Sequence, residues 1–195
     1  MNINEIKNSI AASVIIPPIL PKRILSQDFD DFLFFDANLS SDYEFIEEIQ
    51  RARKLAFREI GTDVVFLYAS DLTTLAIVEG QSAWASGIEK SILAMEARNL
   101  HGGAIVADEQ LSWIAVQSSP VDIGVLGVDF NKKGAREFFE HLNRSWFFSV
   151  SDAAAAIDTD LPLSKTLGRS FLKELVANYR VSDATGGHGQ NHEDL

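Results

Sequence analysis

The chain has 195 residues, of which 46% are hydrophobic and 23% charged, a composition typical of a folded domain that needs neither disulfides nor a metal to bury its core. It has no cysteine, which excludes a disulfide framework, a thiol nucleophile and a thiolate zinc site, and which fits a reducing cytoplasm. The formal net charge of -11 argues against direct binding to nucleic acid or anionic membranes, since a negative field repels both.

The first part of the chain, residues 1–26, is predicted to be a partly extended segment ahead of the main domain. Its apolar run from Ile10 to Leu20 is interrupted by Pro17 and Pro18 and is too short to cross a bilayer. Where a signal peptide would have small residues before its cleavage site, this chain has Pro21-Lys22-Arg23. We therefore expect neither a membrane span nor a signal peptide, and a cytoplasmic protein.

The next segment is strongly acidic, because eight carboxylates and no lysine or arginine lie between Ile24 and Gln50. Such a field attracts cationic partners and speeds their association, although a negative surface can also serve solubility alone. With Trp84 as an aromatic anchor, we expect a partner-binding face. Its predicted residues are Asp28, Asp30, Asp31, Asp42, Glu44, Glu47, Glu48 and Trp84.

A helix is predicted from Ser41 to about residue 60. Ser41 and Glu44 have the spacing of a capping box, in which each side chain satisfies a free backbone N–H of the first turn. Apolar residues then recur at three- and four-residue steps, starting at Phe45 and Ile49, so this helix buries one face.

The middle of the chain is rich in β-formers. Residues 63–70 and 73–80 predict a hairpin because only two residues separate them, and residues 104–107, 112–117 and 122–130 predict a three-stranded meander. A helix from Ser86 to about Asn99 lies between the two groups. Gly124 and Gly127 fall inside the last strand, where glycine indicates a bulge or a close approach of neighbouring groups.

The C-terminal part predicts a helix from Asn131 to about Arg144, a further strand in residues 146–150 and a closing helix from Pro162 to Tyr179. Residues 182–195 predict a flexible polar tail. The fold class expected is α+β: a single domain over residues 27–181, with a mainly antiparallel central sheet of about six strands packed by about four helices.

A hydrolase is the alternative from another functional class. Ser82 follows Gly80 as in the Gly-x-Ser-x-Gly turn of α/β-hydrolases, and Asp122 or Asp129 and then His141 follow it in triad order. However, Trp84 stands where the second glycine belongs. We therefore predict no catalytic serine.

The stretch FLFFDANLS resembles the first motif of haloacid-dehalogenase-type phosphatases, which would make Asp36 the nucleophile. Asn38 replaces the second aspartate of that motif, the general acid of phosphatase members. Histidines cluster with acids only in the tail, as His188 and His192, so no metal and no cofactor are predicted.

The stretch LSWIAVQSSPVDIGVLGVDF, from Leu111 to Phe130, resembles a pattern found in small bacterial immunity proteins of polymorphic toxin systems: a tryptophan-bearing strand, a polar turn with aspartate and an aliphatic-Gly-aliphatic strand. The resemblance implies a cytosolic, non-enzymatic protein that occludes a basic toxin, often a nuclease, through an acidic surface. This is our leading hypothesis. An adaptor subunit that docks through its terminal segments is a further alternative.

Overall fold

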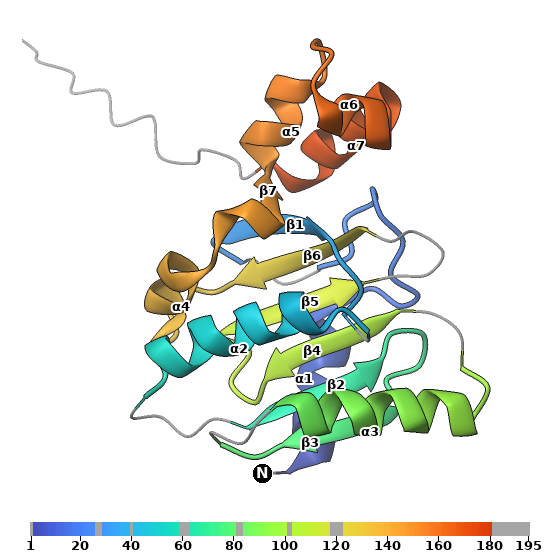
Figure 1. The fold of residues 1–195 in the computed structure, drawn as a ribbon, viewed down its shortest axis with the longest axis vertical. Coiled ribbons are helices and arrows are strands. Elements are labelled where there is room, and N and C mark those ends of the chain that lie inside the picture. Colours follow the sequence, from blue (N-terminus) through green and yellow to red (C-terminus); the bar gives the residue numbers. More distant parts are fainter. Residues whose placement is uncertain are drawn as a thin grey trace, which may run out of the picture.

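The computed structural model describes residues 2–25, 29–39, 41–58, 63–80, 84–100, 103–117 and 123–180. They form a seven-stranded sheet in the order β3-β2-β4-β5-β6-β1-β7, in which every pair of neighbouring strands is antiparallel (Figure 1). The predicted α+β class with an antiparallel sheet is confirmed. The described residues contain seven strands rather than about six, and seven α-helices rather than about four.

The strands follow the predicted hairpin and meander closely. Their bounds are β1 (Asp31–Asp36), β2 (Val64–Tyr68), β3 (Thr74–Val78), β4 (Ala104–Asp108), β5 (Trp113–Gln117), β6 (Ile123–Val128) and β7 (Phe147–Ser149). The central strands β2, β4, β5 and β6 are buried along their whole length, because helices cover both faces of the sheet. Continuous apolar runs therefore replace the alternating pattern of a half-exposed strand.

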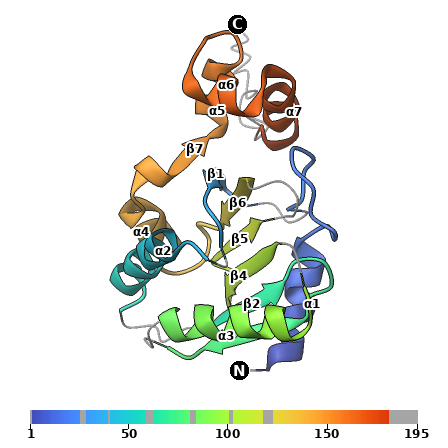
Figure 2. The ribbon, with the colours of Figure 1, turned by 45° about the vertical axis from the view of Figure 1, so that its right-hand side comes forward.

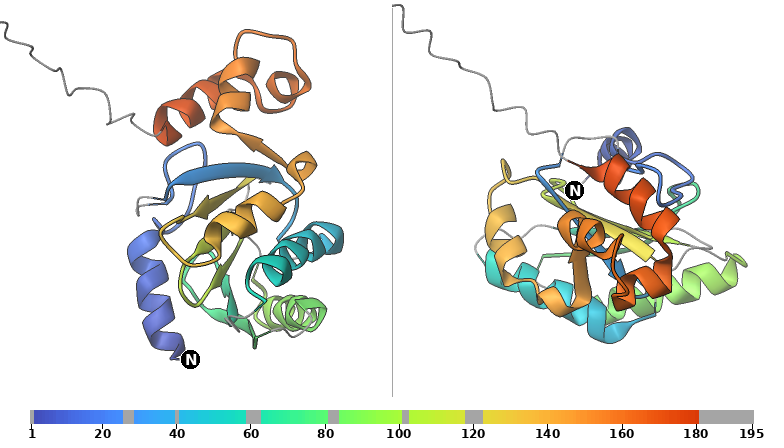
Figure 3. Two further views of the ribbon diagram at one scale, coloured as in Figure 1. Left: turned by 90° about the vertical axis from the view of Figure 1, so that its left-hand side faces the viewer. Right: turned by 90° about the horizontal axis from the view of Figure 1, so that it is seen from above.

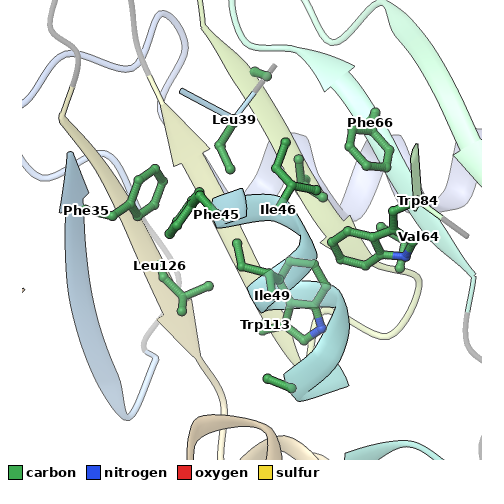
Figure 4. Packing of buried hydrophobic residues seen from close by; sticks show 14 of the residues in the cluster. Phe35, Leu39, Phe45, Ile46, Ile49, Val64, Phe66, Trp84, Trp113 and Leu126 are labelled. Atoms are coloured by element: carbon green, nitrogen blue, oxygen red, sulfur yellow. The ribbon is translucent and has the colours of Figure 1, made fainter. Parts of the chain in front are cut away.

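One face of the sheet is covered by α2 (Tyr43–Ala56), α3 (Trp84–Ala97) and α4 (Ala135–His141). Figure 4 shows Phe45, Ile46 and Ile49 of α2 directed at the sheet, where they meet side chains such as Phe35 and Leu126. The apolar stripe predicted for this helix is thus the surface that it buries.

The other face carries α1 (Ile3–Ser13), α5 (Val150–Ala156) and α7 (Arg169–Tyr179), with α6 (Pro162–Leu167) connecting the last two (Figure 3). Ile6 and Ile10 of α1 are buried in this second core, so the N-terminal segment packs on the domain. Tyr179 completes the core: its ring contacts Phe32 edge-on at 5.2 Å, and its hydroxyl accepts a hydrogen bond from the backbone N–H of Ile24 at 3.0 Å. Figure 2 shows α5–α7 gathered beyond the β7 end of the sheet, and Figure 1 shows β3 at the other end.

Several helix boundaries differ from the prediction. Asp42, not Ser41, caps α2, because its carboxylate accepts the backbone N–H of Phe45 at 3.1 Å. Helix α4 begins only after Gly134, whose φ of +82° ends the preceding turn. The single closing helix predicted after Pro162 is divided into α6 and α7 at Gly168, where φ is +81°.

Gly124 and Gly127 mark close packing, which confirms one of the two interpretations given for them. A Cβ on Gly124 would lie 2.1 Å from the ring of Phe35 on the adjacent strand β1, and one on Gly127 would lie 2.8 Å from Leu25. Each glycine therefore leaves space that a core side chain of a neighbouring segment fills.

Replacement of Gly124 by alanine is expected to destabilise the fold by about 2 kcal/mol, since the new methyl group overpacks a fully buried ring. Urea denaturation measures the loss. The double variant Gly124→Ala with Phe35→Leu is the control, because the smaller side chain frees space beside residue 124. If the double variant is no more stable than the sum of the two single changes predicts, the steric account of Gly124 is wrong.

Candidate functional site

The predicted acidic residues that the structure describes fall into two groups, one at each end of β1. Asp30 and Asp31 lie at the start of β1, whereas Asp42 and Glu44 lie beyond its other end, in the cap and first turn of α2. A six-residue strand separates them by roughly 17 Å, since each residue of a strand advances about 3.3 Å. The carboxylates of this segment are close together in the sequence, but the described ones lie in two separate groups in the structure.

The described carboxylates at the start of β1 interact with neighbouring groups of the protein itself. Asp28 lies outside the described residues. Asp30 accepts a hydrogen bond from the backbone N–H of Phe130 at 2.6 Å and so joins this end of β1 to the turn after β6. Asp31 is half-buried, which raises the pKa of its carboxyl, while the N–H of Phe32 and the charge of Arg144 oppose that rise.

A second group of carboxylates surrounds the N-terminal end of α2, and we call it the α2 patch. It consists of Asp36, Asp42, Glu44 and Glu47, together with Tyr43, which is 44% exposed. Among the described residues, none of these four acids forms an ion pair.

The α2 patch is held together by the turn from β1 into α2. The backbone N–H of Asp42 donates to the carbonyl of Asn38 at 2.9 Å, and the rings of Phe35 and Phe45 lie 4.8 Å apart beneath the turn. Because Asp36 follows Phe35 and Glu44 precedes Phe45, this packing keeps their charges at the same end of the sheet. Acids at a helix N-terminus also stabilise the helix dipole, which accounts for part of their presence here.

Glu48 lies at the edge of the α2 patch and connects α2 to the segment after α4. Its carboxylate accepts hydrogen bonds from Arg51 at 2.7 Å and 2.9 Å and from the backbone N–H of Asn143 at 2.7 Å. These hydrogen bonds lower the pKa of Glu48, and the hydrogen bond from the Arg51 side chain has the largest effect. Glu48 is thus mainly structural.

The expectation that Trp84 is a surface anchor is wrong. Trp84 is only 1% exposed, because α3 begins at this residue and not at Ser86, which turns the indole toward the sheet. Its ring stacks on Trp113 at 5.8 Å, and Trp113 stacks on Phe138 of α4 at 5.1 Å. Tyr43 is the aromatic residue that the α2 patch exposes.

The structure describes only some of the residues proposed for hydrolase chemistry. Ser82 and Asp122 lie outside the described residues, so the esterase alternative stays a prediction. Asp129 is 7% exposed and accepts hydrogen bonds from Asn131, and His141 ends α4, where its carbonyl accepts a hydrogen bond from Arg51. In the described part of the chain, no three His, Asp or Glu side chains gather as metal ligands.

A buried charged centre lies beneath the helices, and the sequence analysis missed it. Arg53 of α2 and Asp108 at the end of β4 are both 0% exposed, and the guanidinium of Arg53 lies over the ring of Trp84 at 5.9 Å. Burial lowers the pKa of Arg53, and the charges of Asp108, Asp63 and Glu109 counteract this effect. The sequence does contain a signal for its burial. Arg53 lies four residues after Ile49, and residues four apart share one face of a helix, here the face that α2 buries.

Asp108 is held in place by the turn that follows β4. One carboxylate oxygen accepts the backbone N–H of Ser112 at 2.7 Å, and the other has no hydrogen-bond partner among the described residues. Burial raises the pKa of Asp108 to about 6, although the backbone hydrogen bond from Ser112 and the charge of Arg53 act in the opposite direction. The group therefore titrates far above the usual range of an aspartate.

A cleft of about 330 Å³ lies on the opposite side of the sheet, between α1 and the turn after β4. Ser9 and Ser13 line one wall, and Glu109, Leu111 and Lys132 line the other. The cleft contains none of the residues predicted to bind a partner.

Comparisons with protein-family models, with curated proteins and with solved structures found no match to this chain. Within the described residues, no helix combines the length and apolarity needed to cross a membrane.

Replacement of Asp108 by asparagine is expected to change how stability depends on pH. A carboxyl with a folded-state pKa of about 6, against an ordinary value of 3.8, stabilises the fold when protonated at low pH, and this contribution is lost as the pH rises through 6. Asparagine does not titrate, so the stability of the variant relative to wild type should increase by about 3 kcal/mol between pH 3.5 and 7.5.

Urea denaturation across that pH range measures the difference, and the Asp158→Asn variant serves as the control for removing one carboxylate at an exposed position. A difference between the Asp108→Asn variant and wild type that does not vary with pH would contradict the assignment of a raised pKa.

Proposed function

We propose that this chain is a non-enzymatic protein-binding module of the immunity or antitoxin type, acting in the cytoplasm of a bacterium and blocking a basic partner. The α2 patch would provide the contact. Its mechanism is steric and electrostatic: the carboxylates steer a cationic surface into place, and the bound domain then covers that surface.

The observation that carries this proposal is the exposure of unpaired charge around one aromatic residue. Asp36, Glu44 and Glu47 are exposed and lack ion pairs in the described structure, while Tyr43 between them is 44% exposed. Exposed aromatic side chains supply much of the affinity of protein interfaces, and surrounding charges supply specificity and association rate. The net charge of -11 extends this attraction beyond the patch.

Simultaneous replacement of Asp36 by asparagine and of Glu44 and Glu47 by glutamine is expected to abolish capture of a basic protein from source lysate, since it removes the steering charges. The basic protein captured by the wild-type chain should elute at a few hundred millimolar salt, because screening weakens exposed charge contacts. Mass spectrometry of the eluate is the measurement.

The matched control replaces three exposed acids away from the α2 patch, Glu5, Asp158 and Glu174, by their amides, and among the described residues none of the three forms an ion pair. Both variants lose the same number of charges, so only position distinguishes them. Equal capture by the α2 patch variant and wild type would contradict the proposed contact. Equal loss in both variants would show that overall charge, and not the patch, holds the partner.

A further inference from the structure

The cleft of about 330 Å³ between α1 and the turn after β4 is formed by three segments of the chain. Its lining includes Ser9 and Ala12 of α1, Glu109, Gln110 and Leu111 of the turn after β4, and Lys132 of the turn after β6. The turn after β6 lies where β1 begins, because Asp31 pairs with Val128. The α2 patch lies where β1 ends, so the cleft and the patch are at opposite ends of the sheet and share no residue.

The two charged residues of the cleft are held by hydrogen bonds to the surrounding fold. The backbone N–H of Glu109 donates to the carbonyl of Asp63 at 3.0 Å, and the Glu109 carboxylate accepts the N–H of Asp63 at 3.4 Å. The N–H of Lys132 donates to the carbonyl of Asp129 at 3.1 Å. The backbone positions of both residues are thus set before a ligand binds, which lowers the entropy cost of binding.

Leu111 closes the turn that carries Glu109 and Gln110. Its φ of +52° lies in the left-handed region, which a leucine rarely adopts. Its backbone N–H donates to the carbonyl of Asp108 at 3.1 Å, and its side chain is buried in the second core. The hydrogen bond and the burial maintain this strained turn, whose residues form one wall of the cleft.

The charges of the cleft are of opposite sign. Glu109 and Lys132 both line it, and they do not form an ion pair with each other. An anionic ligand would meet Glu109 and a net charge of -11, and a cationic ligand would meet Lys132. A ligand that carries both charges can form a charge-assisted hydrogen bond with each side chain. The charge pattern therefore favours a zwitterion.

The size of the cleft and the rest of its lining narrow the class of ligand. Pockets for small molecules usually have volumes of about 300 to 1,000 Å³, so this cleft suits a ligand at the small end of the range. Ala12 and Leu111 provide apolar surface for a short aliphatic group. The hydroxyl of Ser9 and the amide of Gln110 are uncharged groups that can hydrogen-bond to a carboxylate.

We propose that this cleft binds a free α-amino acid with a small neutral side chain. The carboxylate of Glu109 accepts hydrogen bonds from the α-ammonium group, the ammonium of Lys132 donates to the α-carboxylate, and the side chain of the ligand lies against Ala12 and Leu111. The inference does not depend on the proposed function, because the cleft contains no residue of the α2 patch.

Titration of the full chain with L-alanine, L-valine and L-serine, followed by backbone amide NMR spectra, tests this proposal. At least one of the three should bind with a dissociation constant of about 1 mM or tighter. The shift changes should centre on residues 9–13, 109–111 and 132. The N-acetyl derivative of that ligand lacks the ammonium group, and its amide derivative lacks the carboxylate. Each derivative should bind at least about 10-fold more weakly, because it loses a charge-assisted hydrogen bond.

Two variants test the charged contacts separately. Glu109→Gln should weaken binding of the amino acid at least about 10-fold and leave binding of the N-acetyl derivative within about 3-fold, because that derivative has no ammonium group. Lys132→Met should weaken the amino acid similarly and leave the amide derivative within about 3-fold. The matched controls Glu137→Gln and Lys133→Met change exposed residues outside the cleft lining and should bind as wild type does.

Circular dichroism shows whether each variant is folded, and the two derivatives test the same contacts on the wild-type chain without any substitution. Absence of binding by all three amino acids up to about 20 mM overturns the proposal. Shift changes centred outside the cleft overturn it as well. So does a Glu109→Gln or Lys132→Met variant that binds the amino acid as tightly as wild type, or that weakens the amino acid and the corresponding derivative equally.

Discussion

The stack of Trp84, Trp113 and Phe138 is the interaction on which the arrangement of this protein depends most. These rings come from α3, β5 and α4, and they lie nearly parallel, with interplanar angles of 28° and 25°. Phe57, at the end of α2, lies 6.3 Å from Phe138, and Arg53 of α2 lies over Trp84. All three helices of this face are therefore fixed to the sheet and to each other through one group of rings. Aromatic pairs of this kind add about 1 kcal/mol each beyond the area that they bury.

Helix α2 carries buried charge at one end and exposed charge at the other. Arg53 is buried at the C-terminal half of the helix, where the aromatic ring and the carboxylate of Asp108 compensate it, whereas Glu44 and Glu47 are exposed at the N-terminal half. A buried charge is costly to leave uncompensated, so the C-terminal half has one allowed position against the sheet. The N-terminal half of the helix therefore holds the α2 patch in a fixed position. A rigid acidic surface binds a cationic partner with less loss of conformational entropy than a flexible acidic segment.

Hydrophobic pattern and turn length were enough to predict the hairpin β2–β3 and the meander β4–β5–β6, because these strands pair with neighbours in the chain. The pattern did not predict that Asp30 and Asp42 lie at opposite ends of β1, since spatial separation depends on the strand between them and not on charge density. Trp84 was misplaced because Ser86 has good capping chemistry, while burial of the indole favours a helix that starts two residues earlier. Arg53 was missed because its charge suited the helix dipole, and that local role concealed its position on the buried stripe.

The aromatic stack fixes α2 on the sheet and so holds its acidic end in place. Native-state hydrogen exchange of a Trp113→Leu variant tests it most directly, with Phe32→Leu in the second core as the comparison. Trp113→Leu is expected to lower protection in α2, α3 and α4 together, including the amides of residues 46–49, and to affect α7 least. Phe32→Leu should show the reverse order, since Phe32 packs against Tyr179. Unchanged protection at residues 46–49 in the Trp113→Leu variant would show that the stack does not hold this end of α2.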